Sequence, residues 1–324
     1  MGTARLRRMA LWLALGVGVT SFAQAQSTTY PNHPIRMFVG FAAGGGTDVA
    51  ARITAQQMSK ILGQSIVVED RTGASGLIAA QDLAKSDPDG YTLMMGSQTT
   101  CAVAPALYHK VTVDPVKDFS GVALTSASPL VLVVNPSFAA HSVADVIAMA
   151  KANPGKLNFG TGGVGTTPHM TAELFQHDAD IKMVHVAYRG EAGAINDLLA
   201  GQIPLMFANL SAVMGQIKAG TLRALAVTSA QRSPSAPEIP TIAETVLPGF
   251  DSETWWGIVA PPATPLDIRM KLNGVARQAL DLEDTKQRFA ELRLALVERS
   301  SKIAVSSGWN LLRGFGLAVE LDGP

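Results

Sequence analysis

The chain has 324 residues, of which 47% are hydrophobic, and its 26 basic side chains balance its 26 acidic ones. This charge balance excludes the strongly basic proteins that bind nucleic acid or a membrane surface, which carry a basic stripe. The only cysteine, Cys101, excludes an internal disulfide and is expected to be a small buried hydrophobic residue. The length predicts a large core divided between two domains.

The N-terminus resembles a secretory leader. Arg5, Arg7 and Arg8 precede an uncharged apolar run, which ends in Ala23-Gln24-Ala25 with small residues at the cleavage positions. The run is shorter than the roughly 20 residues of a membrane span. We therefore expect residues 1–25 to be a signal peptide, and the mature chain to be exported and about three charges negative.

Short apolar strands alternate with amphipathic helical stretches along most of the chain. This pattern is typical of an α/β protein with mainly parallel sheets flanked by helices. The predicted strands are Ile35–Val39, Ser65–Glu69, Tyr91–Met95, Leu130–Val134, Met183–Ala187, Ile203–Phe207 and Leu222–Val227.

The order strand, glycine loop, helix, strand occurs twice, from Phe38 and from Leu157, with Arg71 and Arg189 in corresponding places. The repeat predicts two similar lobes around a cleft, although any two strand-loop-helix units share this order. Pro129 and the proline-rich stretch 229–240 are the expected crossings between lobes. The prediction is lobe one at 26–128 and 231–293, and lobe two at 129–230.

Both glycine loops, GFAAGGGTDVAAR at 40–52 and NFGTGGVGTTPHM at 158–170, lie where a strand gives way to a helix. Glycines there let a ligand approach the first unpaired N–H groups of the helix, which with the helix dipole favour an anion. Neither loop contains a lysine or arginine in the residues that precede its helix. Recognition would rest on main-chain amides, bridging water and the hydroxyls of Thr47, Thr161, Thr166 and Thr167.

Asp48 stands in the first turn of the first predicted helix, where its charge opposes an anionic guest. It either satisfies backbone donors and the helix dipole or accepts a hydrogen bond from a ligand ammonium or a water. The sequence leaves both interpretations open.

Other classes of protein have weaker signals. GTGGVG at 160–165 matches the dinucleotide-binding pattern G-x-G-x-x-G, but the next strand ends in Tyr188-Arg189 where an acid is expected, so an exported nucleotide-dependent oxidoreductase is the alternative. No G-x-S-x-G hydrolase elbow is present, and His169, His177 and His185 have no metal-ligand spacing. A scaffold that binds a partner protein and no solute is a third class.

Several motifs together resemble the periplasmic solute receptors of tripartite tricarboxylate transporters, also called the Bordetella uptake gene family. They include YPNHPIRMFVGFAAGGGTDVAAR, VVEDRTGASGLIAA, DPDGYTLMMGS, NFGTGGVGTTPHMTAELF, VAYRGEAGAINDLLAGQIPLMF, KAGTLRALAVTS and TWWGIVAPPATP. They occur in the family's order and cover residues 30 to 285.

The resemblance implies a two-lobed periplasmic binding protein fold of type II. It implies capture of a small carboxylated solute and its delivery to membrane permease subunits, with no catalysis, cofactor or metal. We expect a periplasmic monomer with no nucleic-acid partner. The ligand-binding positions carried over from the family are Phe41, Ala43, Gly45, Thr47, Asp48, Ser97, Thr99, Thr161, Gly162, Gly165, Thr166, Thr167, Tyr188 and Asn209.

The C-terminal tail departs from the family pattern. Family members end in an amphipathic helix, whereas SSGWNLLRGFG, interrupted by two glycines, has no clear helix signal. We expect residues 294–324 to be an atypical tail produced by a frame shift or an unrelated extension.

Overall fold

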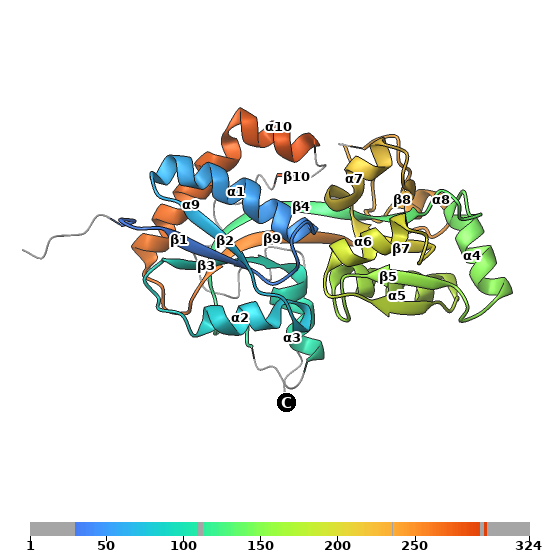
Figure 1. The fold of residues 1–324 in the computed structure, drawn as a ribbon, viewed down its shortest axis with the longest axis horizontal. Coiled ribbons are helices and arrows are strands. Elements are labelled where there is room, and N and C mark those ends of the chain that lie inside the picture. The colour runs from blue at the N-terminus through green and yellow to red at the C-terminus, as the bar shows by residue number, and fades with distance from the viewer. Residues whose placement is uncertain (1–29, 109–112, 235, 292–294, 297–324) are drawn as a thin grey trace, which may run out of the picture. The chain divides into compact units, whose positions relative to one another are not determined.

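The computed structural model describes residues 30–108, 113–234, 236–291 and 295–296, and its main compact unit begins at His33 (Figure 1). The strands are β1 (Ile35–Val39), β2 (Ile66–Asp70), β3 (Thr92–Ser97), β4 (Ser120–Val134), β5 (Asn158–Thr161), β6 (Val184–Ala187), β7 (Leu205–Asn209), β8 (Arg223–Val227), β9 (Glu253–Ala260) and β10 (Ala295–Leu296). The α-helices are α1 (Gly46–Leu62), α2 (Leu77–Ala84), α3 (Ala104–Leu107), α4 (Val143–Ala152), α5 (Thr167–Ala179), α6 (Glu191–Leu199), α7 (Leu210–Lys218), α8 (Ile242–Thr245), α9 (Leu266–Asp281) and α10 (Glu283–Glu291).

The strands follow the order β2-β1-β3-β9-β4-β7-β5-β6, with β8 and β10 also paired to β4. β1 is parallel to β2 and β3, and β5 is parallel to β6 and β7. β4 and β9 are antiparallel to every strand beside them. The α/β arrangement is as predicted, but the pairing is mixed rather than mainly parallel, because these two strands run back through the centre.

Strand β4 belongs to two halves of the molecule. Residues 120–129 pair with β9, whereas residues 130–134 pair with β7 and β8. We call residues 33–129 and 253–296 lobe one, and residues 130–252 lobe two. The first crossing therefore lies between Pro129 and Leu130, next to the predicted boundary.

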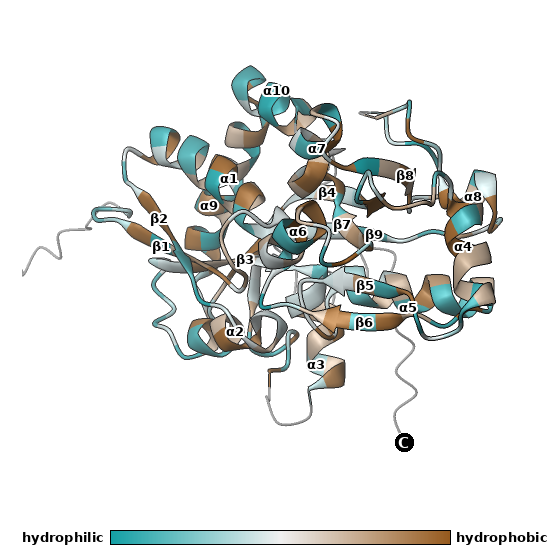
Figure 2. Cartoon of the chain, turned by 45° about the vertical axis from the view of Figure 1, so that its right-hand side comes forward, coloured by the Kyte–Doolittle hydropathy of each residue, from teal (hydrophilic) through white to brown (hydrophobic). Residues whose placement is uncertain are grey.

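Each lobe packs helices against its strands. In lobe one, α1 lies above and α2 below the strands in the view of Figure 1. In lobe two, alternate residues of β4 face opposite ways: Val131 and Val133 belong to one buried cluster and Leu132 and Val134 to another. Both faces of the shared strand are covered, as its uninterrupted apolar sequence requires. By contrast α10, largely hydrophilic in Figure 2, buries only Thr285 and Phe289.

The second crossing lies later than the sequence predicts. Ala236, Ile239, Ile242 and Phe250, expected in lobe one, all pack in the two clusters of lobe two. The chain returns to lobe one only at β9. Proline-rich composition marks the end of the periodic pattern at residue 229, but it does not reveal that the following segment folds back onto lobe two.

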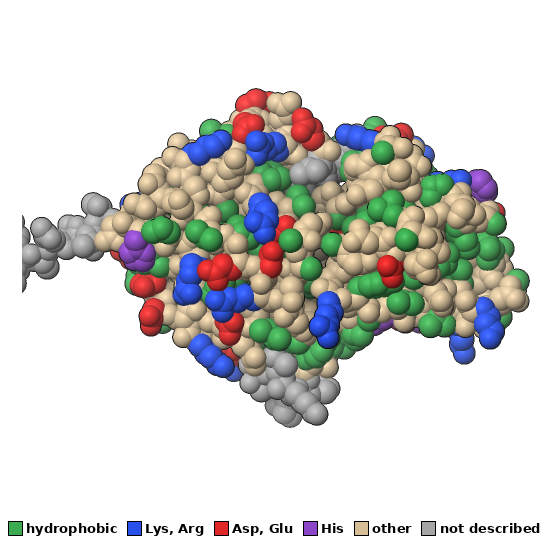
Figure 3. Space-filling model, viewed as in Figure 1, with side chains coloured by type: hydrophobic (Ala, Val, Ile, Leu, Met, Phe, Trp, Pro, Cys, Tyr) green, Lys and Arg blue, Asp and Glu red, His purple; other side chains and the backbone are tan. Residues whose placement is uncertain are grey.

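Several charged side chains on the surface form ion pairs. On the face shown in Figure 3, Lys and Arg side chains are scattered and several lie beside acids. Arg52 contacts Asp70 at 3.2 Å, and Arg71 contacts Glu69 at 3.0 Å and Asp82 at 2.7 Å. This face carries no basic stripe.

Two predictions fall on the chain ends. The predicted leader lies outside the described residues, and so does the predicted tail except for β10, which pairs antiparallel with Ser126 and Ala127 of β4. Within the described segments, every helix is too short or too polar to cross a bilayer.

Phe250 provides a test of the second crossing. Its ring is 2% exposed and meets Phe175 edge to face at 6.3 Å between centroids. We expect Phe250→Ala to lower the free energy of unfolding by about 3–5 kcal/mol, through lost burial and a cavity in lobe two. Denaturant unfolding measures this, with the exposed Met270→Ala as the control. An equally small effect for both variants would contradict this packing.

Candidate ligand-binding cleft

The two glycine loops meet at a common cavity between the lobes. The loop after β1 leads into α1, and the loop after β5 leads into α5. Their residues line a space of about 30 Å³, which holds about two waters. The predicted residues on this cavity are Phe41, Gly45, Thr47, Ser97, Thr99, Gly162, Thr166, Thr167 and Asn209.

Hydroxyl groups join the lobes beside the cavity. Thr99 Oγ1 accepts a hydrogen bond from the Thr167 N–H at 2.9 Å and lies 3.1 Å from Thr167 Oγ1. Ser75 Oγ and Tyr108 OH both donate to the carbonyl of Val164, the latter at 3.0 Å. The N-terminus of α5 is therefore held against lobe one by neutral groups.

Glu191 brings a carboxylate into this neutral surrounding. It is the first residue of α6, 6% exposed, and its Oε2 accepts from the N–H of Gly46 at 3.1 Å. The preceding Gly190 has φ +132°, and a Cβ there would lie 2.9 Å from that of Ala42. This close packing of loop on loop carries Glu191 to the start of α1. Burial raises the pKa of Glu191 above its usual range.

Trp256 closes one side of the cavity. Its side chain is 1% exposed and its Nε1 donates to Thr47 Oγ1 at 2.9 Å. Trp255, next along β9, points to the opposite face and packs in the lobe-one core. The tryptophan pair thus serves as wall and core, as the apolar sequence after it suggests.

Asp48 turns away from the cavity. Its Oδ1 lies 2.6 Å from Arg52 Nε, and its Oδ2 accepts from the N–H of Gly44 at 2.9 Å. Of the two interpretations left open by the sequence, these contacts match the structural one, in which the carboxylate satisfies a backbone donor at the helix start.

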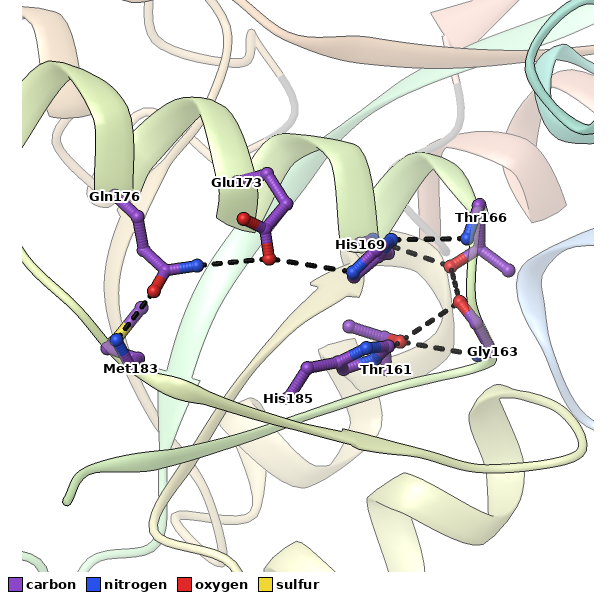
Figure 4. A network of polar contacts seen from close by, with 9 residues as sticks. Thr161, Gly163, Thr166, His169, Glu173, Gln176, Met183 and His185 are labelled. Carbon is purple, nitrogen blue, oxygen red and sulfur yellow. Dashed lines mark hydrogen bonds and ion pairs between the residues drawn. The ribbon is translucent and has the colours of Figure 1, made fainter. Parts of the chain in front are cut away.

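Thr161 supports the second loop from behind (Figure 4). Its Oγ1 is 2.6 Å from His185 Nε2 and 3.2 Å from the Gly163 carbonyl. The His169 ring stacks on His185 with centroids 4.1 Å apart and faces Glu173 at 3.5 Å. These contacts assign Thr161 and His169 to packing and loop support rather than to the cavity lining.

Three further predicted positions lie elsewhere. Ala43 is exposed, and Gly165, at φ +74°, donates its N–H to His169 Nδ1 at 3.1 Å. Tyr188 lines a neighbouring cavity of about 480 Å³ and donates its hydroxyl to Asp197 at 2.7 Å. The predicted residues absent from the lining of the central cavity are Ala43, Asp48, Thr161, Gly165 and Tyr188.

The sequence missed several lining residues. Gly46 and Pro168 lie next to predicted residues at the two helix starts, so the sequence could have identified them as lining residues. Burial of Glu191 depends on contact between lobes and has no local signal. The lining residues outside the prediction are Gly46, Pro168, Glu191, Thr254 and Trp256.

The glycines of GTGGVG are explained by packing within the protein. A Cβ on Gly162 would lie 2.9 Å from the Glu191 nitrogen, and one on Gly165 would lie 2.8 Å from Leu107 Cδ1. A Cβ on Gly160 would collide with Ile203. Among the described residues there is no cluster of three or more metal-ligating side chains.

The chain is similar to known periplasmic receptors. Residues 50–302 match the sequence model of the tripartite tricarboxylate transporter family receptors. BugT of Bordetella pertussis is 37% identical over 83% of this chain and 82% of its own. The periplasmic binding protein BugD is 29% identical, with a TM-score of 0.82 over 89% of this chain and 94% of its own. MatC of Rhodopseudomonas palustris with bound malate is 30% identical, with a TM-score of 0.82 over 88% of this chain and 97% of its own. These matches confirm the predicted two-lobed periplasmic binding protein fold.

The imidazole behind the second loop makes stability depend on pH. Burial, followed by the neighbouring His169, lowers the pKa of His185 to about 4. An unfolded histidine titrates near pH 6.5. Because the folded pKa is depressed, its contribution to stability is complete above about pH 6.5 and is lost as pH falls toward 4. We expect His185→Gln to reduce the acid-induced fall in melting temperature between pH 7 and 4.5. Parallel melting curves for wild type and variant would contradict this.

Proposed function

Because the chain belongs to the tripartite tricarboxylate transporter receptor family, we propose that it captures a small carboxylic acid between its lobes and delivers it to membrane permease subunits. In this proposal the leader exports the chain to the periplasm, and the receptor works as a monomer without cofactor or catalytic step. Closure of the lobes is its only mechanical action.

The convergence of two helix starts on one lined cavity is the observation that carries the proposal. α1 begins at Gly46 and α5 at Thr167, and the N–H groups of these two residues donate to Glu191 Oε2 and Thr99 Oγ1. The positive ends of the two helix dipoles stabilise an anion by about 0.3–1 kcal/mol at exposed sites and up to about 2 kcal/mol when partly buried. Thr47, Thr99 and Thr166 add hydroxyls to the same lining.

The residues that line the cavity include no lysine or arginine. A micromolar complex needs about −8 kcal/mol, more than helix ends alone supply. Hydroxyl hydrogen bonds, closure of the lobes and burial of the solute's carbon chain against Phe41 and Trp256 would contribute the rest. MatC, with its bound malate, indicates a solute of this chemical class.

A carboxylate screen tests the proposal. We expect at least one small carboxylic acid, with L-malate the first tested, to raise the melting temperature of the mature chain. At about a hundred times its dissociation constant a ligand adds about 2.7 kcal/mol of stability. Isothermal titration of the acids that raise it gives the affinity. A complete panel of aliphatic, aromatic and amino carboxylic acids without a shift would refute carboxylate capture.

Removal of one hydroxyl from the lining should weaken binding of the acid found. Thr99→Val removes the hydroxyl whose oxygen accepts from the first N–H of α5. A hydrogen bond from this hydroxyl to the charged carboxylate of the solute would contribute about 1.5–3 kcal/mol to binding. The expected loss of affinity is therefore about tenfold or more. Thr221→Val, at an exposed position of lobe two, is the matched control and should leave the affinity unchanged. Equal affinities for both variants would place the solute elsewhere.

A further inference from the structure

Glu191 occupies the place at the start of α1 where a solute carboxylate would be expected. Its Oε2 accepts from the N–H of Gly46 at 3.1 Å and from Asn209 Nδ2 at 2.7 Å. Its Oε1 accepts from the N–H of Asn209 at 2.5 Å. The first amide of α1 is thus already bonded to an anion that belongs to the protein.

No ion pair joins this carboxylate to a lysine, arginine or histidine among the described residues. Within the part of the chain that the structure describes, its polar contacts are the three N–H groups of Gly46 and Asn209. A buried carboxylate without a cation is costly, and a second anion beside it would add like-charge repulsion. A donor group on a solute would lower that cost.

Asn209 places a second hydrogen-bond acceptor beside the carboxylate of Glu191. An ionised carboxylate can only accept, so the Asn209 amide must direct its Nδ2 toward Glu191. Its Oδ1 is then an acceptor, and this buried atom has no hydrogen-bond partner in the described segments. Asn209 is 9% exposed and lines the cavity together with Glu191. An unsatisfied buried acceptor at a cavity points to a donor on the ligand.

We propose that Glu191 determines the specificity of the cleft, so that the solute is a carboxylic acid whose other end is a neutral or cationic hydrogen-bond donor rather than a second ionised carboxylate. This inference rests on the proposed function. The solute's one carboxylate binds the hydroxyls of the cavity lining, and its donor group lies against Glu191 and Asn209 Oδ1.

The lining of the cavity beside α1 agrees with this division. Glu191 and Trp256 both line the cavity there and donate to or accept from the first two residues of α1. A diacid that placed a carboxylate on Gly46 would first have to displace Glu191 from its three hydrogen bonds.

Succinate and its monoamide, succinamate, form a matched pair of probes that differ only in the second group, which is a carboxylate or a neutral carboxamide. Titration calorimetry at pH 7.5 should show that wild type binds succinamate at least about tenfold more tightly than succinate, which corresponds to 1.4 kcal/mol. Glu191→Gln removes the charge at nearly constant volume, and Glu191→Ala removes the carboxylate altogether. Both variants should bind succinate as tightly as succinamate, or more tightly.

Glu238→Gln is the control, since Glu238 is an exposed acid of lobe two and its replacement changes the net charge equally. It should keep the wild-type ratio of affinities. Circular dichroism and melting curves establish that each variant folds, and if Glu191→Ala does not, Glu191→Gln carries the test.

The outcomes separate this inference from the proposed function. Binding of both probes by wild type with equal affinity would overturn the role of Glu191 and leave the receptor function in place. So would a succinamate preference that survives in a folded Glu191 variant. Failure of wild type and of both variants to bind either probe would count against carboxylate capture itself, and the inference would fall with it.

Discussion

The hydrogen bond from the first amide of α1 to the carboxylate of Glu191 is the contact on which the cleft depends. It joins a helix start in lobe one to a helix start in lobe two. A Cβ on Gly46 would lie only 3.0 Å from the Asn209 side chain of lobe two and from the Trp256 ring of lobe one. Glycine fits between these side chains, whereas a larger residue would push them apart. The candidate binding surface is therefore shaped by backbone and packing, and its lining residues include no lysine or arginine.

The two crossings of the chain between the lobes are held by a different set of contacts. Thr228 Oγ1 accepts from the N–H of Leu130 at 2.9 Å, and the Thr228 carbonyl accepts from the N–H of Ser252 at 2.9 Å. One residue thus ties the two crossings of the chain to each other. Because β4 continues without a break from one lobe to the other, a motion between lobes has to bend or twist this strand near Leu130.

Local features were predictable and contacts between lobes were not. The glycine loops, and most of the strands beside them, are marked by composition over a few residues, so the two helix starts could be located from sequence. An acid at the first position of a helix usually lies exposed and stabilises the dipole, and nothing adjacent to Glu191 indicates otherwise. Its burial follows from the approach of Gly190 to Ala42, which are 148 positions apart in the chain.

The same distinction explains why the second crossing was placed too early. Ile242 enters the lobe-two core from α8, a helix of only four residues, and Phe250 enters it from the irregular segment that follows. Patterns of period 2 or 3.6 detect a strand or a helix face, but a single anchoring side chain has no period. Tertiary contacts, such as that of Phe250 with Phe175, are what assign this segment to its lobe.

Neutral contacts between the lobes suit the capture and release of a solute that we propose for this chain. Each neutral hydrogen bond, such as that between Thr99 and Thr167, contributes only about 0.5–1.5 kcal/mol net. A few bonds of this size bring the lobes together without fixing them there. A solute that contacts both lobes shifts the balance toward closure only by its differential affinity for the closed form. In the proposed function the solute's contacts are hydroxyls rather than a buried cation, which keeps that difference small, so that a permease subunit preferring the open form would be able to reverse it.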